Sequence, residues 1–155
     1  ISKAAVNMSD KKIGALIVIE GKTLLGEIIS TGSAVDSNIT SPMIENIFFP
    51  KAPLHDGAMI IRNNRIHSAG CILPLTQNEV SFELGTRHRA AIGMSEHSDA
   101  LVIVVSEETG AISVAHKGTL ERNVTSGELL ETLNAFLVPD EGEKNKSFRI
   151  RRRKK

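Results

Sequence analysis

Short apolar runs bounded by glycine and polar residues predict a set of buried β-strands. These runs are too short for helices and are rich in the β-branched residues that strands favour. Tight turns at Asn63-Asn64 and within SEETG (106–110) join two pairs of them, which predicts that these pairs are antiparallel. The predicted strands are GALIVIE (14–20), AMII (58–61), RIHSAGCIL (65–73), LVIVV (101–105) and AISVAH (111–116).

Helical spacing occurs in longer segments between and after these strands. RHRAAIGMSEH follows Thr86, which is the expected N-cap of a helix. GELLETLNAFL (127–137) predicts a second helix, which we expect to stop at Pro139. The other expectations are helices over residues 3–10 and 41–49, a loop over residues 30–40, and a shared apolar face of Leu129, Leu130, Leu133 and Leu137.

The alternation of strands and helices is typical of an α/β fold. The tight turns make at least two strand pairs antiparallel, so we expect a mixed α/β (α+β) fold with helices packed around one twisted sheet. A chain of 155 residues fits one domain. Residues 1–140 are expected to form it. Residues 141–155 are rich in charge and poor in apolar side chains, so we expect a disordered basic tail there.

The formal net charge of +1 conceals a strong asymmetry. Eight of the 19 Lys and Arg residues lie between Lys144 and Lys155, so the rest of the chain holds the other 11 against all 18 acidic residues, a net charge of −7. An acidic body must bind a polyanion locally, through placed cations, a helix N-terminus or a metal ion. Aromatic residues make up only 3%, so we expect no nucleic acid as a partner.

Cys71 is the single cysteine, which excludes an intrachain disulfide and a cysteine-based zinc site. No apolar run approaches the ~20 residues that cross a bilayer, and no signal peptide is evident. The chain begins with Ile1, and its first methionine is Met8. We therefore expect a soluble fragment of a longer protein.

The segment LHDGAMII (54–61) is the first of three with residues suited to chemistry. Asp56 stands at the start of a predicted strand beside Gly57. The glycine leaves the backbone bare, so a ligand can lie against it next to the carboxylate. A plain turn is the alternative, since both residues favour turns.

The segment ELGTRHRAAIG (83–93) places Arg87, His88 and Arg89 in the first turn of a helix. Cations are unfavourable there, because they add to the positive end of the helix dipole. Their clustering is explained if an anion such as a phosphate binds at the helix start. An exposed basic turn is the alternative.

The segment VSEETG (105–110) places Ser106, Glu107 and Glu108 after a buried strand. Either glutamate is a suitable oxygen ligand for Mg²⁺ or Mn²⁺, and a polar hairpin turn is the alternative. Neither GxxxxGK[ST] nor GxGxxG is present, so neither of these nucleotide motifs applies. Together the three segments indicate an enzyme that acts on a nucleoside triphosphate.

LHDGAMII together with GTRHRAAIG resembles the diadenylate cyclase (DAC) family. Its two hallmarks are a DGA motif, here Asp56-Gly57-Ala58, and an RHR motif, here Arg87-His88-Arg89. GALIVIE, AGCILPLT and VSEETGAIS are similar to the family as well, and the resemblance covers residues 10–137. The membrane-anchored (CdaA/DacA) type of Gram-positive bacteria is the most similar. The resemblance implies a barrel-like mixed sheet wrapped by helices, and condensation of two ATP into cyclic di-AMP with release of two pyrophosphates.

The resemblance also implies roles for individual residues. A divalent metal, Mg²⁺ or Mn²⁺, would be held by Asp56, Glu108 and His55. The catalytic residues would be Asp56, Gly57, Ala58, Arg87 and His88. The nucleotide would contact Gly70, Ile72, Leu73, Thr86, Arg87, His88, Arg89 and Ser106. Backbone groups around Leu73 would read the adenine edge, whereas Ile72 stands where relatives often carry a stacking tyrosine.

Several partners follow from the same resemblance. Catalysis would need a face-to-face homodimer, because the product is a two-fold symmetric ring of two nucleotides. The parent protein would be anchored in the cell membrane with this domain in the cytoplasm, under control of a CdaR-like regulator and phosphoglucosamine mutase. The main alternative is a catalytically inactive adenine-nucleotide sensor with the same site. A nucleic-acid or membrane-surface module that uses the basic tail is a third possibility.

Overall fold

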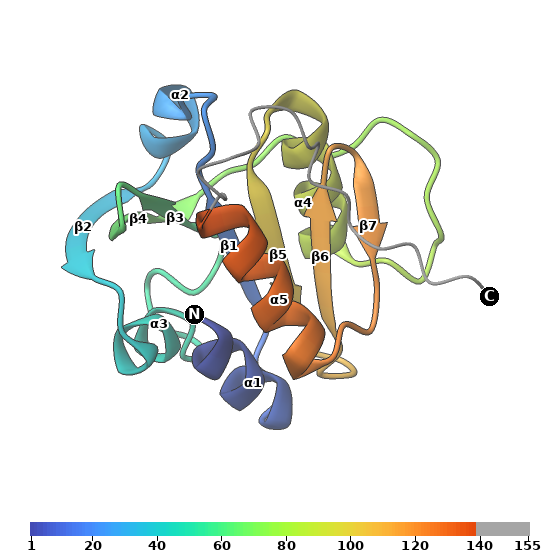
Figure 1. The fold of residues 1–155 in the computed structure, drawn as a ribbon, viewed down its shortest axis with the longest axis horizontal. Helices are drawn as coiled ribbons and strands as arrows, with labels where there is room; N and C mark the ends of the chain where they lie inside the picture. Colours follow the sequence, from blue (N-terminus) through green and yellow to red (C-terminus); the bar gives the residue numbers. More distant parts are fainter. Residues whose placement is uncertain (139–155) are drawn as a thin grey trace.

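A computed structural model of the chain describes residues 1–138 (Figure 1). The expected helix stop at Pro139, the domain end at residue 140 and the basic tail at 141–155 lie outside the described residues. Among residues 1–138, no helix combines the length and the apolar character needed to cross a membrane.

Seven strands form one sheet in the order β2-β4-β3-β1-β5-β6-β7, with β2 and β7 at its edges. The central pair β1 and β3 is parallel, and all the other neighbouring pairs are antiparallel, which confirms the predicted mixed sheet. The strands are β1 (Ala15–Ile19), β2 (Ser33–Asn38), β3 (Ala58–Arg62), β4 (Arg65–Cys71), β5 (Leu101–Val105), β6 (Ile112–His116) and β7 (Thr119–Glu121).

Five helices cover the two faces of the sheet. In Figure 1, α1 and α5 lie in front of the sheet and α4 lies behind it. The helix over residues 127–137 begins with a capping box in which Thr125 and Glu128 bond each other's backbone N–H groups. The helices are α1 (Ser2–Asp10), α2 (Gly26–Ile29), α3 (Ser41–Ile47), α4 (Thr86–His97) and α5 (Ser126–Leu137).

Alternation along the buried strands divides the interior into two apolar clusters. In β1, Ile17 and Ile19 face the larger cluster, which packs against α1, α3 and α5. Leu16 and Val18 point to the opposite face and join the smaller cluster, which packs against α4. Successive side chains of a strand point to opposite faces, so a strand that is buried on both faces must be apolar throughout.

The expected loop over residues 30–40 was wrong, because β2 occupies most of it. Apart from the half-buried Val35, its side chains are polar or exposed, and its backbone pairs with β4, antiparallel and with an irregularity between Ala34 and Ser37. Asp36 has φ = 51° within that irregularity, and its carboxylate pairs with Arg65 at 2.7 Å. An edge strand of this kind carries no apolar run that could reveal it.

Two details of the predicted helices also need correction. The N-cap of α4 is Gly85, and Thr86 is the first helical residue. In α5, Leu129 and Leu133 are buried, but Leu130 and Leu137 are 51% and 44% exposed. Each helical residue is rotated by about 100° from the one before, so Leu130 points away from the face that Leu129 and Leu133 share.

Candidate active site

The sheet topology brings all three chemistry-bearing segments together at one end of the central strands. The start of β1 lies beside the end of β5, because Ala15 pairs with Val105. The parallel neighbour β3 starts at the same end of the sheet, and the last residue of β4 lies there as well, because Cys71 pairs with Ala58. The start of α4 completes the group, so five segments that are distant in sequence surround one site.

A cavity of about 560 Å³ opens at this end of the strands, and its volume is within the range of small-molecule sites. Part of its lining is apolar and part is charged, which suits a ligand with a flat apolar portion and an anionic portion. The lining residues are Leu16, Asp56, Gly57, Cys71, Ile72, Leu73, Leu75, Glu83, Gly85, Thr86, Arg87, His88, Ala90, Val105, Ser106, Glu107 and Glu108.

Nine of the predicted site residues line this cavity: Asp56, Gly57, Ile72, Leu73, Thr86, Arg87, His88, Ser106 and Glu108. Four do not. Ala58 is fully buried under the site, and Gly70 packs against Gly57. The side chain of Arg89 is exposed, and its carbonyl oxygen accepts a hydrogen bond from the N–H of Thr76 at 3.1 Å. His55 lies beside Asp56 but outside the lining.

Gly57 is required by both its conformation and its surroundings. Its φ of 99° is one that side chains other than hydrogen rarely allow. A Cβ built there would lie 2.7 Å from the carbonyl oxygen of Cys71 and 2.8 Å from the carbonyl carbon of Gly70. The backbone of β4 therefore presses against this glycine. The neighbouring Asp56 side chain is 86% exposed at the mouth of the cavity.

The start of α4 is left open toward the cavity. Its N-cap Gly85 has no side chain to satisfy the first backbone N–H groups, and the first intrahelical bond runs from Arg89 N–H to the Gly85 carbonyl at 3.2 Å. The N–H groups of Thr86, Arg87 and His88 are therefore without intrahelical partners. Such a helix start can bind an oxyanion.

Arg87 is the central cation of the site, and its side chain is only 20% exposed. Its Nη2 lies 3.8 Å from Oδ1 of Asp56, and its Nη1 lies 3.5 Å from Oε1 of Glu107. Both distances exceed those of good hydrogen bonds. Its Nε is buried and has no hydrogen-bond partner among the described residues. The two carboxylates thus balance the charge of the guanidinium, but they do not form short hydrogen bonds with its N–H groups.

His88 follows Arg87 in the same turn and is half-buried. Burial lowers the pKa of His88, the positive charges of Arg122 and Arg87 lower it further, and the negative charge of Glu108 opposes the shift. His88 is therefore neutral at neutral pH, when its ring offers one hydrogen-bond donor and one acceptor.

Ser106 shapes the turn that carries Glu107 and Glu108. Its hydroxyl oxygen accepts hydrogen bonds from the N–H groups of Glu108 and Thr109, each at 3.3 Å. The family resemblance implied a ligand contact for Ser106, and the structure adds this local role. The hydroxyl hydrogen can still be donated to an acceptor in the cavity.

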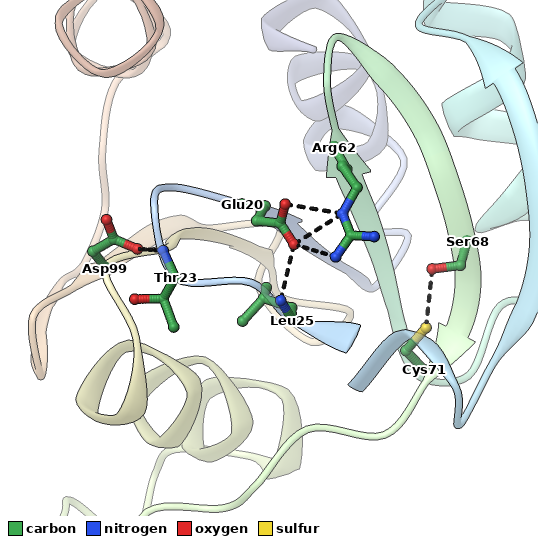
Figure 2. Close-up of polar contacts among 7 residues, drawn as sticks. All are labelled: Glu20, Thr23, Leu25, Arg62, Ser68, Cys71 and Asp99. Atoms are coloured by element: carbon green, nitrogen blue, oxygen red, sulfur yellow. Dashed lines mark hydrogen bonds and ion pairs between the residues drawn. The ribbon is translucent and has the colours of Figure 1, made fainter. Parts of the chain in front are cut away.

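One hydrogen-bonded group lies at the ends of β1 and β3 that are away from the cavity, and another lies in the cavity wall. Figure 2 shows Glu20 bound to Arg62, with the closest oxygen–nitrogen distance at 2.8 Å, and to the N–H of Leu25. Burial favours a higher pKa for Glu20, but the hydrogen bonds and charge of Arg62 and the Leu25 N–H outweigh it and lower the pKa. Figure 2 also shows Cys71 bound to Ser68 at 3.4 Å, and burial raises the pKa of the Cys71 thiol.

The predicted metal ligands are only partly brought together. Among residues 1–138, no three His, Cys, Asp or Glu side chains form a group that could hold a metal ion. The ring of His55 is turned so that Nδ1 bonds the Ala52 carbonyl at 2.7 Å. Asp56 and Glu108 both line the cavity with exposed carboxylates. In nucleotide sites Mg²⁺ is usually held by one or two carboxylates and the phosphates themselves, so this donor set fits such an ion.

Much of the apolar lining could not be predicted from local sequence patterns. Leu16, Ala90 and Val105 belong to ordinary buried elements, and only strand register and helix packing place them at the cavity. Glu83 lies in an irregular loop, where its carboxylate pairs with Arg122 at 3.7 Å.

Comparisons with known proteins identify the family of the chain. A family model described as DisA bacterial checkpoint controller nucleotide-binding (DAC) matches residues 2–120. The cyclic di-AMP synthase CdaA of Bacillus subtilis (strain 168) is 50% identical over 136 residues, which cover 87% of this chain and 50% of CdaA.

Solved structures are similar as well. A double mutant of DacA from Staphylococcus aureus has a TM-score of 0.87 and 48% sequence identity, and the match covers 88% of this chain and 92% of that one. A hypothetical membrane spanning protein from Bacillus cereus has a TM-score of 0.77 and 52% identity over 80% of this chain and 61% of that one.

The chain spans about half the length of the curated relative CdaA, so the comparison concerns the shared domain. Within that domain the match covers every segment that forms the cavity, from β1 to the turn after β5. The resemblance seen in the DGA and RHR motifs is therefore confirmed, and the chain belongs to the DAC family, described as DisA bacterial checkpoint controller nucleotide-binding.

Proposed function

We propose that this domain is a diadenylate cyclase, which condenses two ATP molecules into cyclic di-AMP and releases two pyrophosphates. One observation carries the proposal: the exposed carboxylates of Asp56 and Glu108 share a cavity with the guanidinium of Arg87 and the open start of α4. Carboxylates suit a metal ion, and the cationic helix start suits phosphates. The names of relatives such as the cyclic di-AMP synthase CdaA support the same activity.

The apolar lining is the proposed adenine site. Leu73 and Ile72 follow β4 directly, and the Ile72 side chain is 68% exposed at the cavity. Adenine would lie against these side chains, while backbone groups around Leu73 bond its edge. An isoleucine offers dispersion contacts but no aromatic ring for stacking, so base binding here relies more on the backbone.

The start of α4 is the proposed phosphate site. The N–H groups of Thr86, Arg87 and His88 and the guanidinium of Arg87 are donors for phosphate oxygens. The hydroxyl of Ser106, which also lines the cavity, adds a donor. Neutral His88 donates one hydrogen bond without adding a full charge. Arg89 is exposed and would contribute only long-range attraction.

The reaction forms one bond and breaks one bond at each phosphorus. The ribose 3′-oxygen of one ATP bonds to the α-phosphorus of the other, the bond from that phosphorus to the pyrophosphate oxygen breaks, and the hydroxyl proton is released. Asp56 and Glu108 would hold Mg²⁺ or Mn²⁺, which when bound acidifies the hydroxyl and neutralises phosphate charge. Arg87 and the α4 N–H groups stabilise the negative charge on the phosphates, and the pocket walls align the two reacting groups.

The product requires two ATP sites that face each other. Residues 1–138 provide one cavity with this combination of lining residues, and the ring of cyclic di-AMP has two-fold symmetry. We therefore include a face-to-face homodimer in the proposal, in which each domain presents its ATP to the other.

A membrane-anchored parent protein is also part of the proposal. It is supported by the similarity to a Bacillus cereus chain that is named as membrane spanning. Control by a CdaR-like regulator and by phosphoglucosamine mutase belongs to the same proposal and rests on the family resemblance alone.

Incubation of the domain with ATP and Mn²⁺ tests the activity directly. Cyclic di-AMP and pyrophosphate should form in a ratio of one to two, since each ring closes with loss of two pyrophosphates. The Asp56→Asn variant should fold normally and lose about 10³-fold or more in turnover, because an amide is a poor ligand for a hard cation. ATP binding without any product would identify a nucleotide sensor instead. If the variant kept most of its turnover, the role assigned to Asp56 would be wrong.

A further inference from the structure

We propose that Gly14 is a positioning residue for Arg87. Because it has no side chain, Gly14 leaves the space in which the Arg87 guanidinium is held at the cavity. The inference rests on the proposed function for one point, that Arg87 binds the phosphates of the substrate.

Gly14 directly precedes β1, at the end of the central strands where the cavity opens. It is buried and does not line the cavity. A Cβ built on Gly14 would lie 2.8 Å from Nη1 and 2.9 Å from Cζ of Arg87, and 3.2 Å from Cβ of Glu107. The guanidinium therefore rests against the bare backbone of Gly14.

The backbone of Gly14 does not itself require a glycine. Its φ lies outside the left-handed range, unlike that of Gly57 at 99°. The space taken by Arg87 is thus the physical reason for a glycine at this position. The atoms that a new Cβ would meet most closely are the end of a long, flexible side chain, so an alanine would displace the guanidinium rather than the sheet.

Packing matters here because hydrogen bonds do not fix the guanidinium. Its two terminal nitrogens are 3.5 Å or more from the nearest carboxylate oxygens, and Nε is without a hydrogen-bond partner among the described residues. Contact with Gly14 therefore determines the position of the guanidinium N–H groups of Arg87. Misplacement by about 1 Å can cost about 100-fold in rate when a group must meet a transition state.

A double-mutant cycle tests this. Gly14→Ala, Arg87→Ala and the double variant are compared with the wild type, and Gly127→Ala is the control, because its Cβ would meet no atom within 4 Å. Three quantities are measured: kcat/KM for cyclic di-AMP formation, the calorimetric Kd for α,β-methylene ATP, and the thermal unfolding midpoint. The analogue cannot release pyrophosphate, so its Kd reports binding alone.

Gly14→Ala should lower kcat/KM by about 10- to 100-fold and weaken binding of the analogue, while Gly127→Ala changes each by less than about twofold. In the Arg87→Ala background the same glycine substitution should cost less than about threefold, because the group it displaces is gone. If Gly14→Ala lowers the unfolding midpoint, the double variant should recover it, since the clash is removed.

Equal losses from Gly14→Ala in both backgrounds, or no loss beyond that of Gly127→Ala, would overturn the proposal. The activity proposal fails separately. The wild type could make no cyclic di-AMP while the Kd values of the four proteins for the analogue still follow the predicted cycle. In that case the role of Gly14 is supported and the cyclase activity is not.

Discussion

At the scale of single residues, Arg87 shows how a largely buried cation can remain available to a ligand. It lies between Asp56 and Glu107 at distances too long for strong hydrogen bonds. The carboxylates compensate its charge, so burial is tolerated, yet its donors stay free to turn to a phosphate. The site is thus prepared for an anion before one arrives.

Replacement of Arg87 by alanine should lower kcat/KM for ATP by about 10- to 100-fold, because a hydrogen bond to a charged group contributes about 1.5–3 kcal/mol. Arg65→Ala is the matched control, since Arg65 is 44% exposed and pairs with Asp36 away from the cavity lining. Arg62 is a poor control, because its loss would leave the Glu20 side chain, 6% exposed, without its ionic partner. Similar steady-state kinetics of the two variants would mean that the RHR segment is an ordinary basic surface.

His88 should make the stability of the protein depend on pH. Its folded pKa is lowered from the ordinary value of 6.5 by burial first and then by Arg122 and Arg87. Between the folded and unfolded pKa values the unfolded chain binds more protons, so the free energy of unfolding falls as the pH drops below about 6.5. In His88→Gln this part of the dependence should vanish. Urea unfolding at several pH values measures it, and identical pH profiles of the two proteins would contradict it.

At the scale of elements, the short helix α2 supports the exit of β4. Thr31, just after α2, accepts a hydrogen bond from the Ile72 N–H at 2.8 Å and donates one to the Ile28 carbonyl at 2.6 Å. Ile72 and Leu73 leave β4 from this point to line the cavity. The helix therefore sets the position of the proposed adenine site without touching the ligand.

Thr31→Val keeps the shape of the side chain but removes the hydroxyl. We expect KM for ATP to rise by about 2- to 10-fold with little change in kcat, since one hydrogen bond contributes about 0.5–1.5 kcal/mol. Thr31→Ser retains the hydroxyl and should behave like the wild type. Steady-state kinetics of both variants decide this, and an equal effect of valine and serine would indicate that the methyl group, not the hydroxyl, is what matters.

The elements also show what a sequence pattern can and cannot predict. The strands β1, β3 and β5 were predictable because burial on both faces demands an apolar run, and β4 and β6 were predicted with the help of the tight turns that join them to β3 and β5. The edge strand β2 was predicted as a loop, because its pairing uses backbone groups that are the same in every residue. The strand β7 and helix α2 were missed as well, since three or four residues are too short to show a period.

The DGA and RHR motifs made part of the site predictable from the sequence, whereas the residues packed around them were not predictable. Asp56 was found because the adjacent Gly57 leaves the backbone bare at the start of a strand, and Arg87 because a cation is unfavourable in the first turn of a helix. The approach of Gly14 to Arg87 depends on how β1 and α4 pack, and no local pattern encodes it. Contacts of this kind emerge only from the complete fold.

At the scale of the whole molecule, the proposed chemistry makes activity depend on concentration. If two domains must meet, activity per domain should rise with protein concentration and then level off. Interfaces of modest area commonly dissociate at about micromolar concentration. Specific activity over a wide dilution series, with the oligomeric state measured in parallel, tests this. Deletion of residues 144–155 is the control and should leave the curve nearly unchanged. Full activity from a domain that is monomeric during turnover would exclude the two-site mechanism.

The single thiol gives the cavity its own reporter. Cys71 is the sole cysteine of the chain, it is fully buried, and it lines the cavity. Alkylation therefore has to wait for the wall around β4 to open, and its rate measures the equilibrium for that opening without interference from another sulfur. The raised pKa of Cys71 slows the reaction further and makes it accelerate with rising pH. A bound nucleotide that closes this wall lengthens the labelling half-life, so occupancy can be followed by mass spectrometry even when no reaction takes place.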